Sequence, residues 1–210
     1  MPVVTPVLAL SLLWALVACG RGGGVAQGSA GPPDSAESVS ASASPTSDLP
    51  ADQAAEREAA LAMPAPQRPE NMDENSSEGA IATATYVVQL YPYVYATGDL
   101  EQWKAMSQQD CLFCNSVITN VGKLHEAGGW ISPWTHTITR TDYLDPGPDS
   151  EYSQVDVVFD QEASYSYDGT GAPPDVSEPA TGTLLMLAMK YVDGRWVVRG
   201  GRVEQEEQGE

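Results

Sequence analysis

The sequence predicts an α+β domain in which about three N-terminal helices pack on a curved antiparallel sheet of about four strands. Up to about residue 126, apolar residues recur every three or four positions, as in helices with one buried face. From Trp130 onward the period changes to two, which is typical of half-buried strands. Asp193-Gly194 then has the composition of a two-residue turn between the last two strands.

The first helix is expected to begin at Asn75 and Glu78, which have the spacing of a capping box. Pro92 predicts a kink or an early end, because proline lacks the N–H that a helix interior needs. Residues 79–98 carry no charge, but their hydroxyl and amide side chains favour a buried core helix over a membrane span. The apolar positions share one face: Ala80, Ala84, Val87, Tyr91 and Val94.

Thr97-Gly98 is expected to end this helix, and Asp99 is expected to cap a short second one. Asp110 is expected to cap a third helix, which carries Cys111 and Cys114 in its first turn. Gly128-Gly129 ends that helix and separates the helical half from the strands.

Four strands are expected after the helices. Pro133 indicates a bulge or an edge in the first strand, because it cannot donate to a ladder. Residues 168–179 are rich in glycine and proline and are expected to form a loop. The strands are expected over about 130–143, 151–167, 180–192 and 195–203.

Cys19 follows Leu16-Val17-Ala18 and an apolar stretch of about 12 residues, which is the pattern of a bacterial lipoprotein signal. We therefore expect residues 1–18 to be removed as a signal peptide and Cys19 to carry a diacylglyceryl group. Two acyl chains anchor a protein stably, so the membrane is the first expected partner. The expected location is the outer face of the cytoplasmic membrane.

The remaining chain divides by composition into three parts. Residues 19–65 are rich in Gly, Ser, Ala and Pro and are expected to form a disordered linker, in which residues 52–62 have the helical propensity for a transient helix. Residues 66–205 are expected to form one domain, and residues 206–210 an acidic tail.

With Cys19 lipidated, Cys111 and Cys114 remain as a pair in an oxidising compartment, which favours a disulfide. Two alternatives stay open. The Cys-x-x-Cys spacing also suits a redox site at a helix start. Zinc would need two further ligands, and His125 and His136 are the residues that would have to supply them.

A curved sheet wrapped around a long helix resembles the cone-shaped NTF2-like (nuclear transport factor 2-like) fold. His136 alternates with Trp134 on the first strand, and with Trp130 and Trp196 these residues are expected to line the mouth of the cone. An Asp/His pair in such a cavity is how related folds carry out isomerisation or dehydration. An enzyme of that type, with His136 as its base, is therefore the alternative to a binding domain.

The formal net charge of −19 argues against nucleic-acid binding, because such a surface repels phosphates. No nucleophile elbow, phosphate loop or HExxH motif occurs, so no catalytic residue, metal or cofactor is assigned. The few lysines and the abundant Ala, Gly, Pro and Asp suit a GC-rich genome such as that of an actinobacterium.

Four short motifs together resemble an uncharacterised actinobacterial lipoprotein family, domain of unknown function 6318. The resemblance covers about residues 64–205 and the lipid-attachment motif. It implies a secreted, lipid-anchored, NTF2-like domain and supplies no catalytic residues. The motifs are Glu78-Gly79-Ala80, Thr97-Gly98-Asp99, Cys111-x-x-Cys114 and Gly128-Gly129-Trp130.

The first functional expectation is a non-catalytic lipoprotein that binds a small ligand or a protein partner in the cell envelope. The second is the isomerase- or dehydratase-type enzyme. The third is an envelope scaffold that forms a homodimer through the open face of its sheet. A redox role for Cys111 and Cys114 is the fourth.

Overall fold

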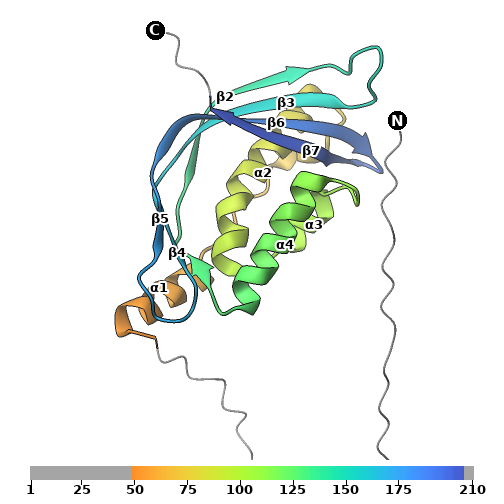
Figure 1. Ribbon diagram of the computed structural model, residues 1–210. Helices are drawn as coiled ribbons and strands as arrows, with labels where there is room; N and C mark the ends of the chain where they lie inside the picture. Colours follow the sequence, from red (N-terminus) through yellow and green to blue (C-terminus); the bar gives the residue numbers. More distant parts are fainter. Residues whose placement is uncertain (1–48, 206–210) are drawn as a thin grey trace, which may run out of the picture. The chain divides into compact units, whose positions relative to one another are not determined.

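The computed structural model describes residues 49–205 and shows an α+β arrangement of helices and two antiparallel sheets (Figure 1). Four α-helices and one 3₁₀ helix lie in this described part, which is one α-helix more than the sequence predicts. The helices are α1 (Ala51–Leu61), η1 (Glu70–Asp73), α2 (Ser77–Thr97), α3 (Glu101–Met106) and α4 (Leu112–Glu126).

The larger sheet has four antiparallel strands in the order β2-β3-β6-β7. The hairpin that joins β6 to β7 turns at Asp193 and Gly194, and both residues have positive φ, as the sequence predicts for this turn. Its strands are β2 (His136–Leu144), β3 (Ser153–Gln161), β6 (Ala180–Val192) and β7 (Arg195–Gln205).

A smaller sheet in the order β1-β4-β5 was not expected from the sequence. The expected strand over 130–143 divides at residues 132–135 around Pro133, and the one over 151–167 divides at residues 162–163. In both cases the chain leaves one sheet and enters the other. The strands of the smaller sheet are β1 (Trp130–Ile131), β4 (Ser164–Tyr167) and β5 (Asp175–Ser177), the last of which lies in the expected loop.

Helix α2 is the central element and lies against the concave side of the larger sheet (Figure 1). It begins one residue later than expected, because the Ser76 hydroxyl accepts the Gly79 N–H over 3.1 Å and forms the N-cap. It ends at Gly98, whose φ of 77° gives the left-handed C-cap. Pro92 does not end the helix early, because α2 continues to Thr97.

The main core forms where α2 meets β3 and β6. Leu90, Val94, Val157 and Leu187 are all fully buried there. Burial of each such side chain contributes about 1.5–3 kcal/mol relative to exposure. Helices α3 and α4 complete the same core beside α2, and α4 packs against β7.

Helix α1 corrects the expected boundary at residue 65, because Ala51–Leu61 lies within the expected linker. Ala60 is fully buried against Trp130, and the Gln53 amide donates to the carbonyl oxygen of Ala172 over 2.9 Å. A helix with such long-range contacts is part of the domain. The folded part therefore begins near Leu49 and not after residue 65.

The expected signal peptide, Cys19, residues 19–48 of the linker and the acidic tail lie outside the described residues. Among the described helices, none combines the length and the apolar character that a bilayer crossing requires.

Candidate functional site

His136, at the start of β2, uses both ring nitrogens in hydrogen bonds within the protein. The Trp134 indole N–H donates to Nε2 over 3.1 Å. An indole N–H is only a donor, so Nε2 is the unprotonated nitrogen and Nδ1 carries the proton. That Nδ1–H donates to the carbonyl oxygen of Val88 in α2 over 2.9 Å. The geometry therefore defines one neutral tautomer of His136.

The acceptor on α2 exists because of Pro92. In a regular helix the Val88 carbonyl would accept the N–H of the residue four positions later, which is Pro92. Proline has no N–H, so this buried carbonyl needs another donor. His136 supplies it, and this explains how α2 continues past a proline in its interior.

Burial lowers the pKa of His136 below its ordinary value, and the bond to the Val88 carbonyl opposes this shift more weakly. Protonation would also place a second N–H on Nε2, directly against the Trp134 indole N–H. No carboxylate of the described part bonds to either ring nitrogen. The imidazole is therefore held neutral as a structural donor and acceptor.

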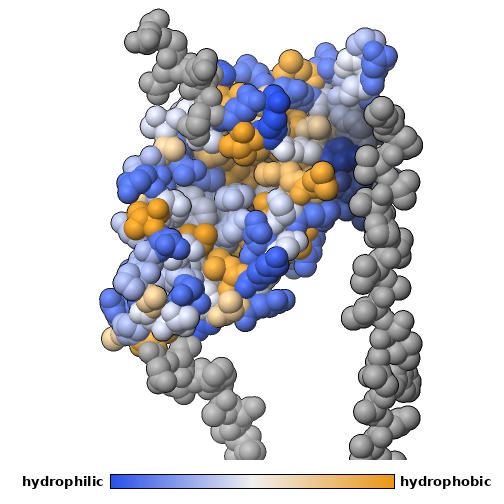
Figure 2. All heavy atoms as spheres, in the orientation of Figure 1, coloured by the Kyte–Doolittle hydropathy of each residue, from blue (hydrophilic) through white to orange (hydrophobic). Residues whose placement is uncertain are grey.

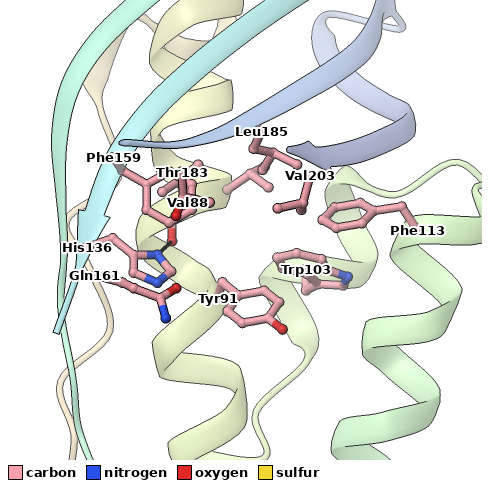
Figure 3. Close-up of a pocket in the computed structure, with 11 residues that line it drawn as sticks. Val88, Tyr91, Trp103, Phe113, His136, Phe159, Gln161, Thr183, Leu185 and Val203 are labelled. Atoms are coloured by element: carbon pink, nitrogen blue, oxygen red, sulfur yellow. Dashed lines mark hydrogen bonds between the residues drawn. The ribbon is translucent and has the colours of Figure 1, made fainter. Parts of the chain in front are cut away.

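His136 also forms part of the wall of a cavity of about 170 Å³ between α2 and the larger sheet (Figure 3). The cavity is closed by α3 and α4 on the side opposite β2 and β3. Among the described residues that form the wall, most side chains are aromatic or aliphatic and none is charged. The lining residues are Val87, Val88, Tyr91, Trp103, Phe113, His136, Phe159, Gln161, Thr183, Leu185 and Val203.

The mouth of the cavity lies at β7. Val203 lines the cavity and is still 56% exposed, so the wall at this residue reaches solvent. Figure 2 shows apolar side chains gathered on this face between the end of β7 and the start of α4. On the face that Figure 2 shows, apolar side chains therefore lie beside the mouth.

Two further hollows border the same residues. One, of about 190 Å³, shares Tyr91 and Gln161 with the first cavity and continues past Ser164 of β4. The other is a groove of about 410 Å³ along residues 63–67, on the far side of Trp134 and His136. Exposed side chains line much of this groove, whereas the first cavity is built from the core.

The structure brings together two of the four residues expected at the pocket. Trp134 and His136 meet as described, but of the four only His136 lines the first cavity. Trp134 lines the two neighbouring hollows, and Trp130 and Trp196 line none of the three, which corrects the sequence-based expectation. Trp130 belongs to the smaller sheet, where its ring stacks on Tyr167 at a centroid distance of 4.6 Å. Trp196 lies near the β6–β7 turn, and its indole donates to the Glu74 carbonyl over 2.8 Å.

Sequence reasoning missed Gln161 and most of the other lining residues. Gln161 lies directly opposite His136 in the β2–β3 ladder, so both side chains stand on the same face of the sheet. The register of two strands cannot be read from composition. Tyr91 was expected on the buried face of the first helix, but nothing in its spacing showed that it would border a cavity.

Cys111 and Cys114 form a disulfide at the start of α4, and both are almost fully buried. Cys111 is the N-cap of this helix, in place of the expected Asp110, and its sulfur accepts the Cys114 N–H. Between the two cysteines lies Phe113, whose ring packs on Gly201 of β7 and lines the cavity. The disulfide thus fixes the turn that positions one cavity wall.

No group of three His, Cys, Asp or Glu side chains within residues 49–205 is arranged to hold a metal ion. Both histidines bond to carbonyl oxygens of α2: His125 contacts the Tyr95 oxygen at 3.0 Å and His136 the Val88 oxygen. The two sulfurs are joined to each other. The four residues considered for zinc are thus otherwise engaged.

The fold and the site define an α+β domain with a small apolar cavity between its central helix and an antiparallel sheet. The chain belongs to the family of unknown function DUF6318, whose profile matches residues 52–202. The match includes nearly all of α1, in agreement with the early start of the folded part. No curated protein matches the chain.

Two solved structures are similar to part of the chain. The intermembrane space region of the chloroplast protein ARC6 is 9% identical, with a TM-score of 0.48 over 62% of this chain and 98% of its own. An uncharacterised protein with a cystatin-like fold from Caulobacter vibrioides is 12% identical, with a TM-score of 0.39 over 63% of this chain and 92% of its own. At these scores neither structure bears on function.

Proposed function

We propose that the protein is a lipoprotein of the outer face of the cytoplasmic membrane, whose NTF2-like cone binds a small, uncharged, mainly apolar ligand without transforming it. Attachment is through a lipid on Cys19. The observation that carries the binding role is the cavity of about 170 Å³ with apolar walls and a neutral His136. The cone is supported by the position of α2 inside the curved four-stranded sheet (Figure 1).

The size of the cavity sets the size of the ligand. An engineered apolar cavity of about 150 Å³ in another protein stays dry and binds benzene. A cavity of about 170 Å³ therefore suits one ring with a short substituent, or an alkyl group of similar volume. Apolar walls with a few polar groups are the usual composition of small-molecule sites.

The isomerase- or dehydratase-type alternative requires His136 to accept a proton from a substrate. Its Nε2 lone pair already accepts the Trp134 N–H, and its Nδ1 proton is held by Val88. A general base also needs a pKa near the working pH, whereas burial lowers the pKa of His136. These contacts support binding over acid–base chemistry.

Binding is tested with toluene as the probe, on the full chain carrying Cys19→Ser so that no detergent is needed. Toluene should shift the ¹H–¹³C methyl resonances of Val87 and Val88, which line the cavity. Leu185→Phe should abolish these shifts by filling the space. Its control is Leu184→Phe, the adjacent residue on the opposite face of β6. Toluene-saturated wild-type protein without methyl shifts would refute the proposal.

Membrane attachment is tested separately from the cavity. Cells that express the wild-type protein should incorporate labelled palmitate into it and retain it in the membrane fraction. Cys19→Ser should lose both the label and the retention. Retention of the label by Cys19→Ser would show that the lipid is attached elsewhere and would overturn this part of the proposal.

A further inference from the structure

Gln161 is a polar group of the cavity whose side chain has no partner within the described part of the chain. Its side-chain carboxamide lines the cavity and makes no hydrogen bond to any other residue of the described part. It comes from the last position of β3, opposite His136. In Figure 3 it lies beside the His136 ring, at the end of the cavity away from Phe113.

Two other polar side chains of the cavity already have partners. The Trp103 indole donates to the Cys114 carbonyl over 3.2 Å. His136 uses both of its nitrogens. Burial raises the pKa of the Tyr91 hydroxyl far above its ordinary value, with a smaller contribution from Tyr95, so this group stays neutral. Gln161 therefore offers two donors and an acceptor that no neighbour uses.

Space for a polar end of a ligand lies on the other side of Gln161. Gln161 and Tyr91 border both the first cavity and the second hollow of about 190 Å³. Ser164 also lines this second hollow, is only 8% exposed, and its hydroxyl has no hydrogen-bond partner within residues 49–205. Two neighbouring polar side chains without partners thus face the same space.

Charge is absent from both linings. No Asp, Glu, Lys or Arg is among the described residues that surround either hollow, although the chain carries 29 acidic side chains. A charged ligand would lose its hydration there without gaining a counter-ion, which is unfavourable. The polar end of the ligand must therefore be neutral.

We propose that Gln161 recognises a neutral carboxamide or lactam edge, joined to the single ring or short alkyl group that fills the first cavity. Such an edge presents one donor and one acceptor side by side and pairs with both functions of the Gln161 carboxamide. Ser164 lies where it can bond the outer atoms of the same group. This inference rests on the proposed binding function and specifies the ligand class of the same cavity.

The test compares three probes with one benzene ring: benzamide and benzoate, which have the same size and differ in charge, and the smaller apolar toluene. Their dissociation constants are measured on the full chain carrying Cys19→Ser, by the methyl shifts of Val87 and Val88. Benzamide should bind at least tenfold more tightly than benzoate. Gln161→Leu should lower the ratio of benzamide affinity to toluene affinity about tenfold or more.

The matched control is Gln154→Leu, the same change on β3 at a position that does not line either hollow. It should leave the affinity for benzamide unchanged. Toluene binding by Gln161→Leu shows at the same time that this variant is folded. Benzamide that binds no better to wild-type protein than to Gln161→Leu would overturn the assignment of Gln161. Toluene binding would still uphold the cavity function in that case, so the two failures are distinguishable.

Discussion

His136 of β2 donates its Nδ1–H to the carbonyl oxygen of Val88, in the middle of α2, over 2.9 Å. This bond joins the edge strand of the larger sheet to the central helix at the one turn where Pro92 removes the regular donor. A position that looks like a defect in the helix is thus the point at which the sheet is attached. The cavity wall is formed at the same place.

The first prediction concerns the coupling between His136 and Pro92. His136→Phe should destabilise the wild-type protein by about 2–3 kcal/mol, because the buried Val88 carbonyl loses its donor. In a Pro92→Ala background the loss should be smaller by about 1 kcal/mol or more, because the N–H of residue 92 can then bond to Val88. Urea unfolding of the four proteins measures the coupling. If the losses of stability caused by His136→Phe and Pro92→Ala added within about 0.5 kcal/mol, the two residues would not be coupled through the Val88 carbonyl.

The second prediction is a pH dependence. The pKa of His136 is lowered in the folded protein, so the unfolded chain takes up a proton first as the pH falls below about 6.5. The stability due to neutral His136 is therefore complete above this pH and decreases below it, with a slope approaching about 1.4 kcal/mol per pH unit. The free energy of unfolding of wild type and His136→Gln should be compared from pH 5 to pH 8. If the free energies of unfolding of the two proteins changed in parallel with pH, the His136 imidazole would not be held neutral in the folded state.

The third prediction uses two glycines with positive φ. Gly98, with φ 77°, would place a Cβ 3.0 Å from the ring of His125, whereas Gly128, with φ 84°, has open space at that position. Gly128→Ala should cost about 1 kcal/mol through backbone strain alone, and Gly98→Ala about 2 kcal/mol or more. Thermal unfolding measures both. Equal losses would mean that His125 does not pack on the α2 C-cap.

The fourth prediction tests whether α1 belongs to the domain. Ala60 is fully buried and Ala59 is exposed, although the two are neighbours on the same helix. Ala60→Asp should destabilise the protein by about 3 kcal/mol, because it places a carboxylate against Trp130. Ala59→Asp should change the stability by less than about 0.5 kcal/mol. If both substitutions had similarly small effects, α1 would not be part of the folded domain.

The fifth prediction separates a structural disulfide from a redox site. Cys111 and Cys114 are no more than 1% exposed, and the Cys114 carbonyl is held by Trp103. We expect a reduction potential below about −300 mV, as for structural disulfides of exported proteins. Equilibration with glutathione or dithiothreitol buffers of known potential gives this value. A potential near that of catalytic pairs, about −200 mV, would favour the redox alternative.

Elements whose signals are local were predicted well from the sequence. The strand at Ala180–Val192 and its turn at Asp193-Gly194 agree with the structure, because a two-residue turn that needs positive φ can be read from its composition. The end of α2 at Gly98 was predicted for the same reason, because this C-cap also needs a residue with positive φ. The order of helices before strands follows from the change of hydrophobic period.

Features that depend on distant contacts were not predicted. The sequence of α1 predicts at most a transient helix in a linker. Its place in the domain depends on distant contacts, such as that of Ala60 with Trp130, about 70 residues away. The division of two long strands between two sheets moved Trp130 away from the cavity. Gln161 was missed because its place beside His136 depends on strand register, which short-range patterns do not determine.

The bond between His136 and Val88 also has an evolutionary consequence. A proline at position 92 is tolerable only while another chain segment donates to the carbonyl four residues earlier. Within this family, positions 92 and 136 should therefore covary. Members with proline at 92 should keep a side chain with an N–H donor at 136, and members with any other residue at 92 should be free to lose it.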